Sequence, residues 1–320
     1  MAVAISILVP VFNVDKYLRQ CLDSIQNQTF KDFEVICIND GSTDASLSIL
    51  EDYAQQDTRF RIISKPNTGY GHSMNIGLSQ CNGEYIGIVE SDDYIEPTMF
   101  ETLYHLAKKQ NLDIARCNYY CFTQHDKFKQ DLHYIPVDTV VRPLDEAAIF
   151  YQAPSIWANL YRKVFLDQHH IRFLETPGAS YQDTSFSFKV YAYSQRFMFV
   201  DQPLLNYRID STNSSINNKD KVFCVCTEYD EILSFAKQHE QIYQRLKHHI
   251  PMLRFGAYSW NYSRIHPKYR MDFLKTWGKA IAADVLAERI HADVTPFRKR
   301  KKMWFIRHLP IVYKWRKKAL

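Results

Sequence analysis

The first 120 residues alternate apolar runs of strand length with amphipathic stretches of helix length, and this alternation constrains the fold more than any other feature of the chain. The expected strands are 5–10, 33–39, 60–64, 84–90 and 112–118, and the expected helices are 16–28, 43–54, 71–80 and 97–109. Elements in this order form parallel sheets with helices on both faces. The sequence therefore predicts an α/β fold with a Rossmann-like, mostly parallel sheet flanked by helices.

The pattern changes twice after residue 120. The next stretch is irregular and rich in aromatic side chains, with a helix expected at 181–193 and short strands at 197–200 and 204–208. The chain then becomes helical, at 220–239, 242–262 and 269–289. We therefore expect one domain over 1–215, made of the halves 1–118 and 119–215, followed by a helical extension over 216–296 and a basic tail over 297–320.

Bulk composition is that of a soluble globular protein, with 46% hydrophobic and 23% charged residues. We expect no transmembrane helix, because there is no apolar run of about 18 residues. The first ten residues lack the basic region of a signal peptide, and they fit a first strand instead. The seven cysteines are scattered and have no histidines at zinc spacing, which is typical of reduced, structural cysteines in the cytoplasm.

The net charge of +5 is unevenly distributed. Residues 297–320 carry ten Lys and Arg and no acid, which leaves 30 basic and 35 acidic side chains, a net of −5, on the rest of the chain. An acidic body argues against nucleic acid as the main partner. In the tail, Trp304, Phe305 and Trp315 interleave with the basic residues, and this combination suits an anionic membrane surface. A solvated basic tail and an RNA-binding tail are the alternatives.

An acidic segment, Glu90-Ser91-Asp92-Asp93, follows the apolar run 85–89. Acids at the carboxyl end of a parallel strand lie where α/β folds bind ligands. Carboxylate oxygens suit a hard divalent cation, and such a cation usually accompanies phosphates. The segment therefore indicates metal-assisted chemistry on a nucleotide. The alternative is a solvated acidic turn before the helix that Pro97 starts.

Two further loops end strands at the same edge of the predicted sheet. The first contains Pro10 and Phe12, and the second contains Asp40 and Asp44. Asp40 can accept the imide N–H of a uracil, and Phe12 can stack on a base. The alternatives are an ordinary Asp-Gly turn for Asp40 and core packing for Phe12. For Asp44 we favour the simpler role of a charge at a helix N-terminus.

Taken in order, these motifs resemble the family 2 glycosyltransferases of the GT-A fold, and in particular the type that builds bacterial surface polysaccharides. The matching segments are 9–13, 17–18, 24–30, 33–36, 39–44, 67–69, 75–77, 83–86 and 90–93, followed by Pro97. The resemblance covers roughly the first two thirds of the chain. It implies that the half 1–118 binds a nucleotide sugar and that the half 119–215 carries the acceptor and catalytic groups.

The resemblance also implies roles for residues of the first half. Pro10, Phe12, Asp40, Glu90 and Ser91 fall in the donor site. Asp92 falls on the direct ligand of Mg²⁺ or Mn²⁺. One departure is Met74, where many relatives have an Arg that contacts the donor; His72, Lys65 and a later basic residue are candidates to replace it.

In the second half, the resemblance implies that Asp183 is the catalytic base, although a helix-start Asp is the alternative. Trp157 lies in an acceptor-side segment, where an exposed ring would stack on a sugar and a buried one would belong to the core. Arg208 lies in the segment 207–214, which we expect to be a flexible loop that closes over the diphosphate.

The implied reaction is an inverting, metal-dependent transfer of a sugar, with UDP-hexose the expected donor. The acceptor would be a saccharide or lipid-linked saccharide in cell-surface polysaccharide synthesis, at the cytoplasmic face of the plasma membrane. Nucleotidyltransferases and dinucleotide-binding oxidoreductases need glycine-rich loops after the first strand, and 9–13 lacks them. A non-catalytic sugar-nucleotide-binding or scaffold protein is the remaining alternative, and intact Asp40, Asp92 and Asp183 argue against it.

Overall fold

The computed structural model of the chain describes residues 3–211 and 221–316, with side chains described as far as Lys314. The chain forms two compact units, Met1–Asn213 and Ser214–Leu320, which we call the α/β unit and the helical unit. The boundary that we expected at residue 215 lies outside the described residues.

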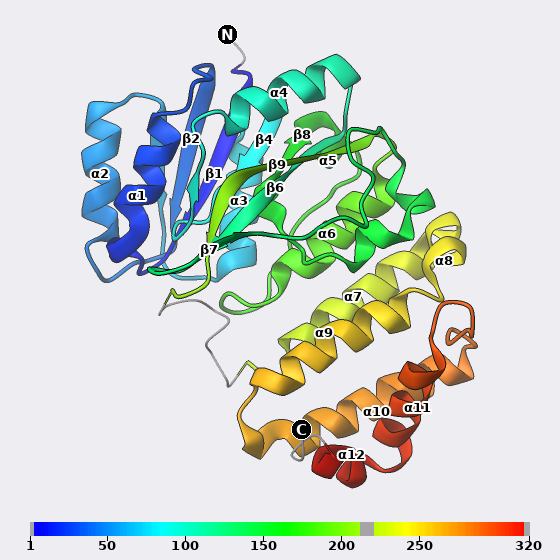
Figure 1. Ribbon diagram of the computed structural model, residues 1–320. Helices are drawn as coiled ribbons and strands as arrows, with labels where there is room; N and C mark the ends of the chain where they lie inside the picture. The colour runs from blue at the N-terminus through cyan, green and yellow to red at the C-terminus, as the bar shows by residue number, and fades with distance from the viewer. Residues whose placement is uncertain (1–2, 212–220, 317–320) are drawn as a thin grey trace. The chain divides into compact units, whose positions relative to one another are not determined.

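One sheet organises the described part of the α/β unit (Figure 1). Its strands are β1 (Ile5–Val11), β2 (Phe33–Asn39), β3 (Phe60–Ser64), β4 (Tyr85–Ile88), β5 (Tyr94–Ile95), β6 (Ile114–Phe122), β7 (Lys127–Lys129), β8 (Asn159–Arg162) and β9 (Phe197–Arg208). They lie in the order β3-β2-β1-β4-β8-β6-β9-β5, and β7 pairs with β6.

The first half of the sheet is parallel, as the alternating pattern predicts. Strand β1 is buried along its whole length and pairs in parallel with β2 and β4. Val11 lies opposite Asn39, and Leu8 lies opposite Ile88. The loops that follow these three strands therefore open at one edge of the sheet, which is where α/β folds bind ligands.

The second half of the sheet is mixed, so "mostly parallel" describes only the first half. Strand β8 is antiparallel to β4 and β6, whereas β9 is parallel to β6. The two short strands expected at 197–200 and 204–208 are one strand, β9. The register of β9 shifts opposite Asn118, beside Pro203, which cannot donate a ladder hydrogen bond. A bulge therefore carries the strand past the proline.

Helices cover both faces of the sheet, as Figure 1 shows. They are α1 (Asp15–Gln26), α2 (Ser46–Gln56), α3 (Tyr70–Gln80), α4 (Met99–Gln110), α5 (Lys163–Gln168) and α6 (Gln182–Tyr193), with short 3₁₀ turns η1 (Pro143–Asp145), η2 (Ala147–Tyr151) and η3 (Ile156–Ala158). The buried face of α1 consists of residues that recur at helical spacing: Tyr17, Leu18, Cys21, Leu22 and Ile25. All seven cysteines are free thiols, and all but Cys224 are buried.

The helical unit contains α7 (Cys224–Gln238), α8 (Glu240–Leu246), α9 (Ile250–Arg264), η5 (Pro267–Tyr269), α10 (Arg270–Leu286), α11 (Phe297–His308) and α12 (Pro310–Arg316). The single helix expected at 242–262 is divided into α8 and α9, because Pro251 belongs at a helix start and not in a helix interior. The core of the unit is aromatic, with Tyr258, Phe273 and Trp277 in mutual ring contact.

The expected basic tail is not separate from the helical extension, because α11 and α12 pack on α10. Met303 and Ile306 are buried, and the Tyr313 ring contacts those of Tyr262 and Trp277. The apolar residues between the basic ones therefore serve partly as core. Among the described residues, no helix is both long enough and apolar enough to cross a membrane.

Candidate active site

The acidic segment lies in the loop directly after β4, at the ligand-binding edge of the sheet. Burial raises the pKa of Glu90 to about 8, a hydrogen bond from Tyr70 opposes this rise, and the charges of Asp92 and Asp183 add to it. Burial also raises the pKa of Asp92, against a hydrogen bond with Ser211. These carboxyl groups repel one another and are poorly solvated, so a bound cation would stabilise their ionised forms.

Asp93 has a different role from its neighbour. It is only 1% exposed, and its Oδ1 accepts a hydrogen bond of 2.8 Å from the backbone N–H of Arg208. Burial, and then the charge of Asp92, raise the pKa of Asp93 well above its ordinary value. The buried side chain joins the acidic loop to β9, so Asp93 holds Asp92 in place and does not face solvent.

The structure brings Asp183 close to Glu90 of this acidic loop, although about 90 residues separate the two segments in the sequence. Asp183 is the second residue of α6, and the helix begins directly after Tyr181, whose φ of 68° is left-handed. Burial raises the pKa of Asp183 to about 6, and hydrogen bonds with Thr184 and the backbone oppose the rise. Its charge in turn raises the pKa of Glu90. With a pKa of about 6, the Asp183 carboxylate is mostly ionised at neutral pH and able to take a proton.

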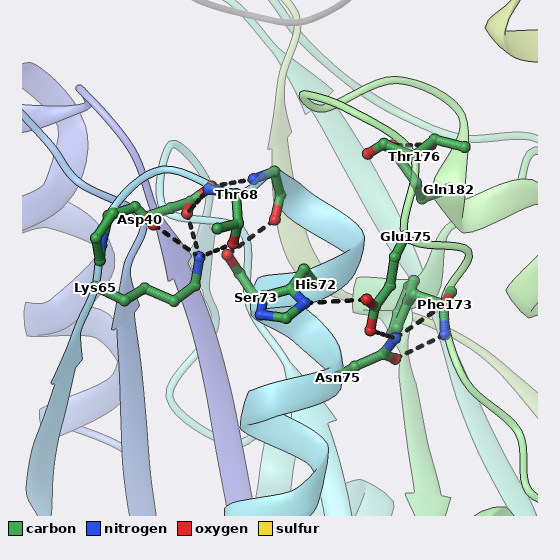
Figure 2. Close-up of polar contacts among 12 residues, drawn as sticks. Asp40, Lys65, Thr68, His72, Ser73, Asn75, Phe173, Glu175, Thr176 and Gln182 are labelled. Carbon is green, nitrogen blue, oxygen red and sulfur yellow. Dashed lines mark hydrogen bonds and ion pairs between the residues drawn. The ribbon is translucent and has the colours of Figure 1, made fainter.

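Asp40 is buried at the end of β2 and is more than a turn residue. Its carboxylate accepts hydrogen bonds from the backbone N–H of Thr68 (2.9 Å) and Gly69 (3.0 Å) and pairs with the Lys65 ammonium (Figure 2). An ionised carboxylate has about four acceptor positions, so these three donors leave capacity for one more. Asp40 thus orders the loop between β3 and α3 and can still accept an N–H from a ligand.

Phe12 follows β1 with 49% of its surface exposed, so the alternative of core packing is wrong. An exposed ring beside Asp40's loop is available to a planar ligand. Pro10 lies inside β1, buried, opposite Ile38 of β2. Ser91 is buried within the acidic loop.

Neither expected substitute for the missing arginine is unpaired. Met74 is fully buried in α3 and belongs to the core. The His72 ring pairs with Glu175 at 3.0 Å, and Lys65 pairs with Asp40 and Thr68. The residues at 65 and 72 therefore stabilise the loops on either side of α3.

Arg208 lies in β9, not in the flexible loop that we expected, and it is only 9% exposed. Its guanidinium donates to the carbonyl of Asp92 (2.9 Å) and to Gln20 Oε1 (2.6 Å), and it lies 4.5 Å from the ring centroids of both Tyr17 and Phe122. These contacts hold the guanidinium in place, so Arg208 positions the acidic loop. Residues 212–214 of the expected loop lie outside the described residues.

Trp157 does not have the exposed face that stacking on a sugar requires. It is 8% exposed, because the Tyr207 ring stacks on it at 4.9 Å and the Tyr119 ring meets it edge-on at 4.6 Å. The sequence interpretation missed Tyr207. Burial, then the charges of Asp93, Asp92, Asp183 and Glu90, raise its pKa, so its phenol lies near all four acids. The sequence feature that could have identified Tyr207 is its place directly before Arg208 in the segment 207–214.

The described residues do not by themselves form a complete set of metal ligands. Within residues 3–211 and 221–316, no three His, Cys, Asp or Glu side chains converge as a metal-binding group. Asp92 and Glu90 nevertheless offer oxygen donors of the kind that Mg²⁺ and Mn²⁺ prefer. The donor set fits a cation that is shared with the phosphates of a bound nucleotide, and does not fit a cation that the protein holds alone.

Comparison with known proteins identifies the family to which the chain belongs. The profile of the family described as "Glycosyl transferase family 2" matches residues 6–176, more than half of the chain. The putative glycosyltransferase EpsH of Bacillus subtilis is 33% identical over 227 residues, which cover 69% of this chain and 65% of EpsH. The uncharacterized glycosyltransferase EpsJ of Bacillus subtilis is 28% identical over 98% of this chain and 92% of its own length.

Among solved structures, that of Staphylococcus aureus TarS 1-349 in complex with UDP-GlcNAc matches with a TM-score of 0.70. The match covers 97% of this chain and 89% of that chain at 21% identity, so it bears on the fold, and it confirms the GT-A fold that we expected. The family match ends before Asp183, so the candidate base rests on its position in the site.

Proposed function

The chain belongs to glycosyl transferase family 2, and on that premise we propose that it transfers a sugar, with inversion, from a nucleoside diphosphate sugar to a saccharide or lipid-linked saccharide. The observation that carries this proposal is the proximity of Asp183 to Glu90, whose pKa its charge raises and which lies two residues before Asp92. Such a transfer needs two acidic groups with separate tasks. One holds the cation that accompanies the diphosphate, and the other takes a proton from the acceptor.

We propose that the donor is a UDP-hexose. Phe12 supplies an exposed ring for the base, and the remaining acceptor position of Asp40 suits the imide N–H of uracil. Support also comes from TarS, a solved structure of the same fold in complex with UDP-GlcNAc. Pro10 and Ser91 would shape the donor site through the backbone of β1 and of the acidic loop.

Asp92 would hold Mg²⁺ or Mn²⁺, with Glu90 beside it. When bound, the cation stabilises the negative charge of the departing diphosphate. Arg208 donates to the Asp92 carbonyl, and the Asp93 side chain accepts from the Arg208 N–H, so Asp92 would be held in place before the donor arrives. Because Asp92 is already ordered, the entropic cost of binding the cation and the donor is smaller.

Asp183 would remove the proton from the acceptor hydroxyl. Its pKa of about 6 is high enough to make a useful base and low enough to leave it ionised at neutral pH. We assign no sugar contact to Trp157, because it is buried. Its partner Tyr207, which lies among the acids, is the better candidate for a contact on the acceptor side.

We further propose that α11 attaches the enzyme to the cytoplasmic face of the plasma membrane, where a lipid-linked acceptor for surface polysaccharide would be found. Phe297, Lys301, Trp304 and His308 recur at helical spacing and are all exposed, with Phe297 at 71% and Trp304 at 51%. Met303 and Ile306 face the core instead. A face of aromatic and basic side chains suits an anionic lipid surface.

The decisive experiment is a donor screen with the purified full-length chain. UDP-glucose, UDP-galactose, UDP-GlcNAc and GDP-mannose would each be incubated with MnCl₂, with MgCl₂ and with EDTA. We expect release of the nucleoside diphosphate from one UDP-sugar, dependent on the cation and lost in Asp92→Asn. A protein that binds UDP and turns over none of the four donors, even with candidate acceptors, would instead be a sugar-nucleotide-binding or scaffold protein.

A further inference from the structure

The N-terminal part of α3 and the loop before it contact Asp40, the acidic loop after β4, and the loop that leads to Asp183. Backbone N–H groups of the loop before α3 donate hydrogen bonds to the Asp40 carboxylate. The hydroxyl of Tyr70, the first residue of α3, donates to Glu90. The other side of α3 contacts the loop 173–182, which leads directly into Asp183. Figure 2 shows α3 between Asp40 and Lys65 on one side and Phe173, Glu175 and Gln182 on the other.

The backbones of α3 and this loop lie unusually close together. The Tyr70 N–H donates to the Gly178 carbonyl at 3.0 Å. A Cβ on Gly69, where φ is 96°, would lie 2.9 Å from the Gly178 nitrogen, and one on Gly71 would lie 2.1 Å from the Leu174 oxygen. Glycine is therefore required at both positions for the close approach.

The Asn75 side chain forms hydrogen bonds with both the N–H and the carbonyl of Phe173, as a neighbouring β-strand would. Its Oδ1 accepts from the Phe173 N–H at 2.9 Å, and its Nδ2 donates to the Phe173 carbonyl at 3.0 Å and to Glu175 Oε1 at 2.8 Å. One side chain thus satisfies both backbone groups of a loop residue. Leaving such groups unpaired is costly when they are shielded from water.

Gln182 completes the connection to Asp183. It is 2% exposed, and its Nε2 donates to the Gly178 carbonyl (3.0 Å) and to Thr176 Oγ1 (2.9 Å), while its Oε1 accepts from the Ser180 N–H. The Gly178 carbonyl therefore receives donors from both α3 and the residue adjacent to Asp183. The geometry allows little independent movement of the loop, Tyr181 and Asp183.

From these contacts, and on the basis of the proposed function, we propose that Asn75 is a positioning residue. Through the loop 173–182, it sets where Asp183 lies relative to the donor-binding acids. Asn75 touches no group that we assign to donor, metal or acceptor. A general base must lie within about 3 Å of the group whose proton it removes. A small displacement of the loop should therefore lower the rate of the chemical step and leave the affinity for the donor unchanged.

The test compares Asn75→Ala with Asn27→Ala, which also removes an amide bound to a backbone carbonyl, but at the exposed end of α1. Amide hydrogen exchange does not depend on activity. We expect faster exchange in peptides spanning 173–182 of Asn75→Ala, unchanged exchange in 33–39, and no change in Asn27→Ala. Wild-type exchange throughout Asn75→Ala would overturn the proposal.

A double-mutant cycle with Asp183→Asn separates positioning from general damage. With the donor found in the screen, Asn75→Ala should lower kcat for transfer on the order of tenfold to a hundredfold, with the affinity for UDP and Mn²⁺ unchanged. In the Asp183→Asn background, the same change should have less than about a twofold effect, since it acts through the base. Equal losses in both backgrounds would refute positioning. Failure of wild type to use any donor would refute the proposed function and leave the exchange result standing.

Discussion

The Tyr70 hydroxyl donates a hydrogen bond of 2.6 Å to Glu90 Oε1, which connects the start of α3 to the acidic loop after β4. Burial raises the pKa of both groups, that of Tyr70 well above its ordinary value and that of Glu90 to about 8. The bond favours the ionised form of Glu90, because a carboxylate is a better acceptor than a neutral carboxyl group. Tyr70 therefore helps Glu90 to act as an anion beside Asp92.

We predict that Tyr70→Phe weakens the binding of UDP in the presence of Mn²⁺ while the protein stays folded. Loss of the hydroxyl removes a hydrogen bond to a poorly solvated carboxyl group, a change that costs about 1–3 kcal/mol. Calorimetric titration of UDP at pH 7 would measure the affinity, and thermal melting would check the fold. Wild-type affinity in a folded variant would show that the bond does not contribute to the donor site.

Glu90 also predicts a pH dependence of stability. Its pKa of about 8 in the folded chain lies above the ordinary value of 4.5, so the folded state holds this proton more tightly than the unfolded state does. The stabilisation is therefore complete below about pH 4.5 and is lost as the pH rises through about 8. In metal-free buffer, the melting temperature of wild type should fall across this window relative to that of Glu90→Gln. Parallel pH profiles of the two proteins would contradict the raised pKa.

For Asp92→Asn, we predict a folded protein that has lost cation-dependent turnover. Burial raises the pKa of Asp92, so the neutral amide fits its surroundings at least as well as the carboxylate does. The loss of a ligand to the cation should lower turnover by about a hundredfold or more. Thermal shift with UDP would show an increment on addition of MnCl₂ in wild type and none in the variant. Near wild-type turnover in a folded variant would reject Asp92 as metal ligand.

For Asp183→Asn, we predict unchanged affinity for UDP and Mn²⁺, with transfer reduced by about 10²–10⁴, the usual contribution of a general base. In wild type, the transfer rate should rise with pH through about 6, because Asp183 acts in its ionised form. Loss of this limb of the pH profile in the variant would identify the group. Equal losses of donor affinity and transfer would indicate instead that Asp183 is structural.

The sequence predicted best where periodicity and local motif carry the information. The inward face of α1 and the parallel order of β1, β2 and β4 follow from apolar spacing alone. The positions of Asp92 and Asp40 follow as well, because each lies in the loop that follows a buried strand. Strand ends and the loops that follow them are local features, and the crossover rule brings them to one edge of the sheet.

The failures concern side chains whose state depends on contacts distant in sequence. The guanidinium of Arg208 is held by Gln20 and by the Tyr17 and Phe122 rings, and Trp157 is covered by Tyr207. No local pattern reports these pairings. In the same way, the basic residues of α11 predicted a tail separate from the helical extension, although Met303 and Ile306 place α11 in the core of the helical unit.

The packing of α11 also determines how membrane attachment should be tested. Deletion of 297–320 would remove Met303, Ile306 and Tyr313 from the core, so loss of activity after that deletion would not be informative. Substitutions on the exposed face avoid this difficulty. Phe297→Ser with Trp304→Ser removes the aromatic contribution, Lys301→Glu reverses one charge, and Trp260→Ser changes a tryptophan of α9 that is similarly exposed, at 45%.

We predict that the full-length protein sediments with liposomes of anionic lipid at low salt and that the two kinds of substitution weaken binding differently. Each basic side chain near the surface contributes about 1 kcal/mol, and added salt screens this contribution. The aromatic pair should account for the part that resists salt, because apolar burial does not depend on ionic strength. Lys301→Glu should therefore weaken mainly the binding at low salt, the aromatic pair should abolish binding at high salt, and Trp260→Ser should bind as wild type does. Donor hydrolysis should be unchanged in all three, since the donor site lies in the α/β unit. If wild type fails to sediment with anionic liposomes at low salt, the membrane proposal is wrong, and the exposed face of α11 would more reasonably contact another protein.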